Sequence, residues 1–312
     1  MKNLGFVFPG QGSQKVGMLA DLASGFSLVE ETFSEASAAL GEDLWQIAQL
    51  DAQQKLNQTD FTQPVLLAAS VAIWRVWQSL DGPQAVILAG HSLGEYSALV
   101  CSGVLRFADA VQLVHQRGRF MQSAVSAGSG KMAAIVGLDD KKITQLCEQA
   151  SGGELVSPAN FNSPGQTVIA GDADAVDRAM ALCKEAGAKR ALPLNVSVPS
   201  HCALMRPAAE KLQARLDKVE FGKAQIPVLQ NVNAQASADP EEIKKNLIKQ
   251  LYTPVLWVDS IKAMREYGIE RIIECGPGKV LSGLIRRIEP DIACSAVDES
   301  ASLRGAIEAA SA

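Results

Sequence analysis

The stretch AVILAGHSLGEYSALV, from Ala85 to Val100, constrains the fold more than any other part of the sequence. An apolar run meets a Gly-x-Ser-x-Gly turn around Ser92, and a helical pattern follows. A buried strand, a tight turn of small residues and a helix, in this order, expose a serine hydroxyl at the tip of the turn. The stretch therefore predicts that Ser92 is a nucleophile. The alternative is a serine that only caps the helix.

Two further apolar runs have the pattern of buried strands that lead into glycine-containing loops. LGFVF spans Leu4–Phe8 and RIIEC spans Arg271–Cys275, and together with Ala85–Ala89 they predict a parallel sheet. Helical patterns lie between these strands, notably over Phe61–Leu80, Phe107–Val125 and Pro240–Leu251. We therefore expect an α/β protein whose large domain has an α/β-hydrolase-like arrangement around the parallel sheet.

The segment 126–194 has a different pattern from the chain on either side of it. Its apolar periodicity predicts a strand, a helix, two strands around a Pro-Gly turn, a second helix and a last strand. The order βαββαβ is the ferredoxin-like split motif. We expect residues 126–194 to form a small inserted domain, and residues 1–125 and 195–312 to form the large catalytic domain.

Composition excludes several classes of protein. The net charge of −5 argues against a protein that binds nucleic acid or a membrane surface. The most apolar stretch, Pro64–Trp74, is far shorter than the roughly 20 residues that span a bilayer. Six scattered cysteines form no Cys-x-x-Cys pair, so we expect neither disulfides nor a metal site. Free thiols are typical of the reducing cytoplasm, where we expect this protein.

A nucleophilic serine needs a general base, and the sequence has only three histidines. His91 directly precedes Ser92 and is poorly placed to reach its neighbour's hydroxyl. His115 falls off the apolar stripe of a predicted helix, where we expect it to be solvated. His201 is therefore the predicted base by elimination. No acidic residue lies near it between Leu192 and Pro207, so its partner is either an acid from elsewhere or a backbone carbonyl.

Arg117 stands on the apolar face of a predicted helix, three or four residues from several large apolar side chains. A guanidinium in such a place requires an anion, because an unpaired buried charge is costly. The pattern leaves two interpretations open. Arg117 either forms a structural pair with an internal Asp or Glu, or it binds a carboxylate of the substrate.

Taken together, these motifs resemble those of the bacterial malonyl-CoA:acyl carrier protein transacylases, stand-alone enzymes of type II fatty acid synthesis. The resemblance extends from Phe6 to Arg287 and rests on several motifs in a fixed order. These are FPGQGSQ, GHSLGEYSALV, RGRFMQ around Arg117, NFNSPGQ, PSH and GPGKVL. The resemblance implies a Ser-His acyltransferase that works by a ping-pong mechanism.

The resemblance also implies a role for individual residues. Ser92 would carry the malonyl ester, and His201 would be the general base. Gln11 and Leu93 would form the oxyanion hole through their backbone N–H groups, and Arg117 would bind the malonyl carboxylate. The backbone carbonyl of Gln250 would orient His201, which would explain the missing acid. The remaining residues, expected only to line the cleft, are His91, Asn160 and Asn162.

The implied substrates are a coenzyme A thioester and the phosphopantetheine thiol of acyl carrier protein, with no metal or other cofactor. We expect a monomer. Five basic residues could face these anionic partners at the cleft rim, namely Lys189, Arg190, Lys279, Arg286 and Arg287. Ser200 departs from the Phe that often precedes the histidine in this family, so a methylmalonyl or polyketide-loading acyltransferase is one alternative. A serine thioesterase or esterase of the same core fold is another.

Overall fold

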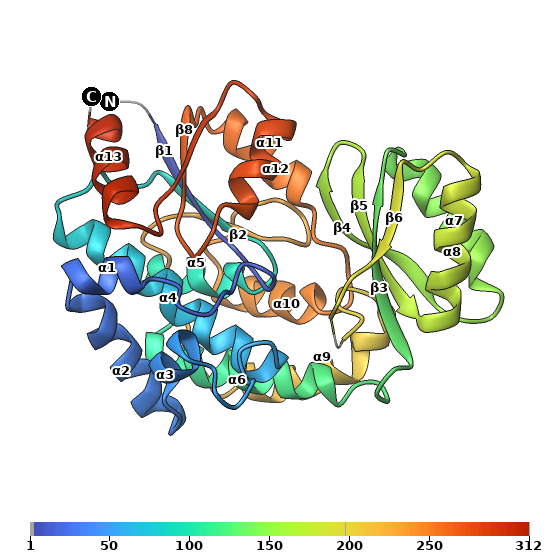
Figure 1. The fold of residues 1–312 in the computed structure, drawn as a ribbon, viewed down its shortest axis with the longest axis horizontal. Helices are drawn as coiled ribbons and strands as arrows, with labels where there is room; N and C mark the ends of the chain where they lie inside the picture. The colour runs from blue at the N-terminus through green and yellow to red at the C-terminus, as the bar shows by residue number, and fades with distance from the viewer. Residues whose placement is uncertain (1–2, 197, 312) are drawn as a thin grey trace.

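The computed structural model describes residues 3–196 and 198–311 of the chain. These residues form two separate sheets, a parallel one and a smaller antiparallel one, with helices around both (Figure 1). The predicted α/β fold class is therefore confirmed. Residues 1–2, 197 and 312, which belong to the predicted large domain, lie outside the described residues.

The large sheet has the strand order β7-β2-β1-β8-β9, and all its neighbouring strands are parallel. Its strands are β1 (Leu4–Phe8), β2 (Ile87–Gly90), β7 (Val228–Leu229), β8 (Arg271–Glu274) and β9 (Ala293–Ala296). The three predicted strands are β1, β2 and β8, and β2 begins two residues later than predicted. The loops after β1, β2 and β8 emerge at one edge of the sheet, where α/β proteins bind their ligands.

Helices cover both faces of the large sheet. They are α1 (Ala20–Gly25), α2 (Leu28–Leu40), α3 (Leu44–Gln49), α4 (Thr59–Ser79), α5 (Gly94–Cys101), α6 (Phe107–Gln122), α9 (Arg206–Leu216), α10 (Pro240–Gln250), α11 (Trp257–Glu266), α12 (Val280–Ile288) and α13 (Ser300–Ser311), with a 3-10 turn at Ala203–Met205. The three helices predicted by name are α4, α6 and α10. Helix α6 ends three residues earlier than expected, at Gln122. No helix of the described chain is both long and apolar enough to span a membrane.

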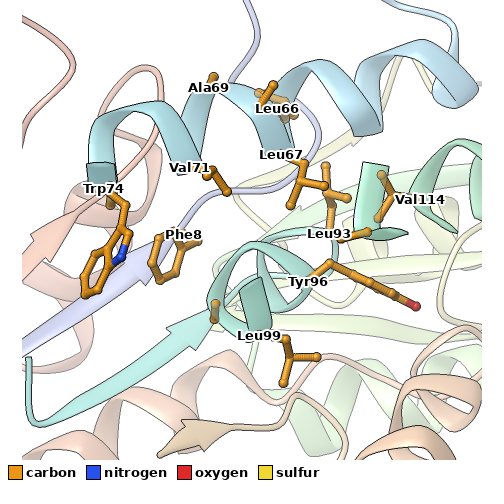
Figure 2. Close-up of a cluster of buried hydrophobic side chains, with 14 of the residues drawn as sticks. Phe8, Leu66, Leu67, Ala69, Val71, Trp74, Leu93, Tyr96, Leu99 and Val114 are labelled. Carbon is orange, nitrogen blue, oxygen red and sulfur yellow. The ribbon is translucent and has the colours of Figure 1, made fainter. Parts of the chain in front are cut away.

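Helix α4 forms the centre of the main core. It contacts α2, α5 and α6, and most of its side chains are buried. Figure 2 shows its Trp74 beside Phe8 at the end of β1, and its Leu67 beside Leu93 at the start of α5. Two residues earlier on β1, Phe6 packs edge-to-face against the ring of Trp74, with 5.0 Å between ring centroids. This packing holds α4 against β1.

The small sheet has the strand order β4-β5-β3-β6, and its neighbouring strands are antiparallel. Its elements follow the chain as β3 (Gly130–Val136), α7 (Asp140–Ser151), β4 (Val156–Ser163), β5 (Gln166–Asp172), α8 (Ala173–Glu185) and β6 (Arg190–Pro193). Figure 1 shows α7 and α8 side by side on the outer face of this sheet, where they share an apolar core with it. This is the predicted βαββαβ order.

Strand β4 connects the small sheet to the rest of the molecule. The backbone N–H of Phe161 donates to the carbonyl of Val255, and the N–H of Val255 donates to the carbonyl of Ala159. Val255 lies just before α11. These bonds hold the inner edge of the small sheet close to the carboxyl edge of the large one.

Gly118 allows α6 to approach the first turn of α4, and its substitution gives a sharp test of this packing. A Cβ at Gly118 would lie 2.5 Å from the backbone Cα of Asp60, whereas a Cβ at Gly283 of α12 would meet nothing within 4 Å. We expect Gly118→Ala to lower the free energy of unfolding by about 1–3 kcal/mol. The matched control Gly283→Ala should be neutral or stabilising by up to about 1 kcal/mol.

Urea unfolding of the two variants measures both effects. Equal midpoints for Gly118→Ala and Gly283→Ala would contradict the close backbone contact between α4 and α6.

Candidate active site

Ser92 lies at the tip of a strained turn between β2 and α5. Its φ is +52°, a left-handed conformation that is uncommon for a residue other than glycine. The two glycines of the motif make the turn possible. A Cβ at Gly90 would lie 1.9 Å from the carbonyl carbon of Gly94, and a Cβ at Gly94 would lie 2.0 Å from the carbonyl oxygen of Phe8. Only glycine fits at either position.

Asn231, which follows β7, stabilises this turn through two side-chain hydrogen bonds. Its Oδ1 accepts a 2.7 Å hydrogen bond from the backbone N–H of Ser92. Its Nδ2 donates to the carbonyl of Gly90 over 2.6 Å. The side chain is fully buried. Asn231 was not among the predicted site residues, because a single asparagine after a two-residue strand carries no periodic signal.

His201 faces Ser92 directly. Its Nε2 lies 2.7 Å from Ser92 Oγ, and its Nδ1 lies 2.7 Å from the carbonyl oxygen of Gln250. A carbonyl oxygen can only accept, so Nδ1 carries the proton and Nε2 is free to accept the serine hydroxyl proton. The position of the ring is set by a backbone carbonyl where a hydrolytic triad uses an acid.

Burial determines the protonation of His201. The imidazole is 3% exposed. Its burial, followed by the Arg117 guanidinium, lowers the pKa of His201 from 6.5 to about 3. The imidazole is therefore neutral at physiological pH, the form in which it can take a proton from Ser92.

Arg117 of α6 is buried without an acidic partner. It is 1% exposed, and no salt bridge of the described residues includes it. Its Nη1 donates to Gln63 Oε1 over 2.8 Å, and its Nη2 donates to Gln250 Oε1 over 3.0 Å. Nη2 also lies 3.4 Å from Ser92 Oγ. The described residues thus contain no direct ion pair for Arg117. The buried Glu95 acts on it through its charge and through Gln250, which bonds to both side chains.

Two backbone N–H groups near Ser92 have no partner among the described residues. In the turn around Ser92, the N–H groups of Gly94 and Glu95 donate to the carbonyls of His91 and Ser92, respectively. The N–H of Leu93 has no hydrogen-bond partner among the described residues. The N–H of Gln11, in the loop after β1, is likewise unbonded within this part of the chain. Both residues line the same cleft as Ser92. Such N–H groups are suited to stabilise an oxyanion.

The cleft has a volume of about 170 Å³ and is lined by residues of the small sheet and by residues of loops and helices around the large one. His91 is bound to the small sheet, since its Nε2 lies 2.8 Å from Asn162 Oδ1, and within the described residues the hydrogen-bond partners of Ser92 Oγ are His201 and Arg117. Asn160 lies on the same strand, and its backbone pairs with Val255. All three predicted lining residues, His91, Asn160 and Asn162, face the cleft.

The remaining predicted residues do not line the cleft. The five basic residues expected at the rim are all exposed, and Arg287 Nη1 donates to Gln166 Oε1 of β5 over 2.5 Å. The expectation that His115 is solvated was wrong. His115 is half-buried, and its Nδ1 lies 2.8 Å from the carbonyl of Asp60, because α6 packs tightly against the start of α4. No set of three His, Cys, Asp or Glu side chains that could hold a metal ion occurs in residues 3–196 and 198–311.

Comparison with known proteins agrees with this geometry. Residues 5–289 match the family model described as acyl transferase domain. The chain belongs to this acyl transferase family. A malonyl CoA-acyl carrier protein transacylase of Salmonella typhimurium is 56% identical over 98% of this chain and 99% of its own. The Escherichia coli K12 protein of the same name is 56% identical over 99% of this chain and 100% of its own.

Solved structures agree with the fold. An acyl carrier protein S-malonyltransferase of Vibrio cholerae superposes with a TM-score of 0.96 at 58% identity, over 97% of this chain and 99% of that one. A malonyl-transacylase solved in complex with a type II PKS acyl-carrier protein superposes with a TM-score of 0.97 at 54% identity, over 98% of this chain and 99% of that one. The resemblance inferred from the motifs is therefore confirmed.

The neutral His201 makes the stability of this acyl transferase depend on pH. The unfolded chain binds a proton at this histidine near pH 6.5, whereas the folded chain does not until about pH 3. Stability from this group is therefore lost as the pH falls below 6.5, by up to about 1.4 kcal/mol per pH unit. We expect His201→Gln to remove this loss. The unfolding free energy of the variant, relative to that of the wild type, should therefore increase as the pH falls from 6 to 4.

Urea unfolding at several pH values measures the difference. The control is His115→Gln, which changes the same residue type outside the cleft. Parallel pH profiles for the wild type and His201→Gln would show that burial does not keep His201 neutral.

Proposed function

We propose that this acyl transferase moves a malonyl group from coenzyme A to the phosphopantetheine thiol of acyl carrier protein through an ester on Ser92. The observation that carries the proposal is the Arg117 guanidinium. It is buried, it has only neutral hydrogen-bond partners, and its Nη2 lies 3.4 Å from Ser92 Oγ. A malonyl group brings its own carboxylate, which can form a direct ion pair with Arg117.

In the first half-reaction, Ser92 Oγ attacks the thioester carbonyl of malonyl-CoA while His201 Nε2 takes the hydroxyl proton. The negative charge develops on the carbonyl oxygen, where the N–H groups of Leu93 and Gln11 stabilise it. The C–S bond then breaks, and His201 returns the proton to the coenzyme A thiolate. The malonyl ester remains on Ser92.

In the second half-reaction, the thiol of acyl carrier protein takes the place of coenzyme A. His201 accepts the thiol proton, the sulfur attacks the ester, and Ser92 leaves with that proton. Ser92 and His201 could also catalyse hydrolysis, so transfer to the carrier requires that water be excluded from the malonyl ester. The narrow cleft between the two sheets and its apolar lining residues, among them Met121, Met132 and Val198, support this requirement.

The substrate carboxylate also adjusts the base. Arg117 is a cause of the low pKa of His201, second to burial. A carboxylate bound at Arg117 offsets the guanidinium charge and so raises the pKa of His201 from that low value. The base strengthens when the acyl group that carries the carboxylate is in place.

In this reaction the chain works as two domains that enclose the cleft. Residues 126–194 act as a small domain that closes the cleft over the catalytic domain formed by residues 1–125 and 195–312. The exposed basic residues at the rim attract the phosphates of coenzyme A and the acidic surface of the carrier. The steps need no metal or redox cofactor. The protein acts as a monomer in the cytoplasm, where its six free cysteines remain reduced.

Intact-protein mass spectrometry tests the reaction. After brief mixing with malonyl-CoA, we expect one malonyl adduct on the wild type and none on Ser92→Ala. Addition of phosphopantetheinylated acyl carrier protein should move the adduct to the carrier. An adduct that decays to free malonate at the same rate without carrier would make the protein a hydrolase.

Replacement of Arg117 tests the substrate. We expect Arg117→Ala to cost malonyl transfer about 2–5 kcal/mol in kcat/KM, the range for breaking a desolvated charge pair. Acetyl transfer, which has no carboxylate, should lose much less. The matched control is Arg119→Ala, an exposed arginine of the same helix that does not line the cleft. Equal losses for malonyl and acetyl transfer in Arg117→Ala would assign Arg117 a structural role.

A further inference from the structure

Glu95, in the first turn of α5, is a buried carboxylate that the mechanism above does not use. Its side chain is fully buried. Oε2 accepts a 3.0 Å hydrogen bond from the backbone N–H of Asn231 and a 2.8 Å bond from Nε2 of Gln250. Oε1 has no partner among the described residues. Burying a carboxylate with so few hydrogen-bond partners lowers the free energy of unfolding, so its position three residues after Ser92 requires an explanation.

The bond to Gln250 leads to Arg117 and His201. With Nε2 held by Glu95, the amide of Gln250 directs Oε1 toward Arg117 Nη2 at 3.0 Å. The same Nε2 lies 3.0 Å from the carbonyl oxygen of Ser92. The backbone carbonyl of Gln250 holds His201 Nδ1. A rotation of this amide by 180° would face an N–H group toward the guanidinium, and the bond to Glu95 prevents it.

The bond to Asn231 leads to the nucleophile. Glu95 fixes the backbone of Asn231, and the Asn231 side chain bonds to the N–H of Ser92 and the carbonyl of Gly90. These bonds hold Ser92 at its positive φ. One carboxylate oxygen therefore connects, through two amide residues, the nucleophile, the base and the cation.

We propose that Glu95 is a positioning residue for acyl transfer, whose ionised carboxylate orients the Gln250 amide and the Asn231 loop so that Arg117, His201 and Ser92 are aligned. The proposal rests on the proposed function, because malonyl transfer is the reaction it serves. Glu95 does not touch the substrate or the reacting atoms. It acts only through Gln250 and Asn231.

The arrangement should depend on pH, because a protonated carboxyl is a weaker acceptor. Burial raises the pKa of Glu95 to about 7, against the hydrogen bonds and the Arg117 charge, which lower it. The other titratable groups that face this region are Tyr96, whose pKa burial raises to about 12, and His201 and His91, whose pKa values burial lowers. Glu95 is therefore the group of this cluster that titrates near neutral pH.

The test is the pH profile of Ser92 malonylation by malonyl-CoA, followed by rapid quench and mass spectrometry from pH 6 to pH 8. For the wild type, we expect kcat/KM to fall about tenfold from pH 8 to pH 6, the ratio of ionised carboxylate for a pKa of about 7. Glu95→Gln keeps an acceptor oxygen but carries no charge, as the protonated carboxyl does. It should therefore react at about the wild-type pH 6 rate over the whole range, about tenfold below the wild type at pH 8, and show no decline toward pH 6.

Two further variants complete the test. Glu95→Ala has no acceptor, and we expect its malonylation to be at least about 30-fold slower at every pH. Glu274→Gln is the matched control, a buried carboxylate that caps α12 through Leu281 and Ser282 and does not line the cleft. It should keep the wild-type profile. Any titration of the substrate phosphates affects all variants equally.

A wild-type decline that persists in Glu95→Gln would overturn the proposal, as would wild-type rates in Glu95→Ala. If Glu95→Ala fails to fold, the profile of Glu95→Gln decides alone, since a merely structural carboxylate would change stability and leave the profile in place. Failure of the proposed function is a separate outcome, in which the wild type itself forms no malonyl adduct.

Discussion

A buried guanidinium with no direct ion pair among the described residues is the constraint on which the rest of the site depends. Arg117 extends from α6 into a cleft where its partners are the neutral amides of Gln63 and Gln250. Neutral partners orient a cation but do not neutralise it, so the site has its lowest energy when an anion arrives. The same positive charge lowers the pKa of His201. In the proposed reaction, binding of a carboxylated acyl group therefore both fills the site and strengthens its base.

The second constraint is backbone strain at Ser92, the proposed nucleophile. Ser92 and His201 both have positive φ angles, of 52° and 62°. Such conformations persist only where the surroundings hold them. The parallel strands β1 and β2 bring the glycines of the elbow against Phe8, and Asn231 fixes the Ser92 backbone from the next strand. The buried amides and the carboxylate of Glu95 thus stabilise a geometry that the local sequence alone would not adopt.

Much of this architecture could be predicted from the sequence, because regular periodicity encodes it. The three central strands, the βαββαβ order and the Ser92 elbow follow from apolar runs and glycine spacing. Strand β7 has only two residues, and no residue of β9 is fully buried, so neither has an apolar pattern. Arg117 stood out because a charge on an apolar face is rare.

The hydrogen bonds that position Ser92, His201 and Arg117 could not be predicted from sequence patterns. The role of Gln250 lies in its backbone carbonyl, and its assignment came only from the resemblance to a known family, because a carbonyl leaves no side-chain signal. Asn231 and Glu95 come from separate elements and meet only in the folded chain. Their partners are set by the crossing of β7, α5 and α10, which no short stretch of sequence contains.

The most direct test of the account replaces the substrate carboxylate and leaves the protein unchanged. Ser92 acylation by malonyl-CoA would be compared with acylation by its terminal amide, which has nearly the same shape and no charge. The account predicts that the amide reacts at least about 30-fold more slowly, a difference of about 2 kcal/mol. Equal rates for the two thioesters would contradict the central claim that Arg117 is buried to receive the carboxylate of the acyl group.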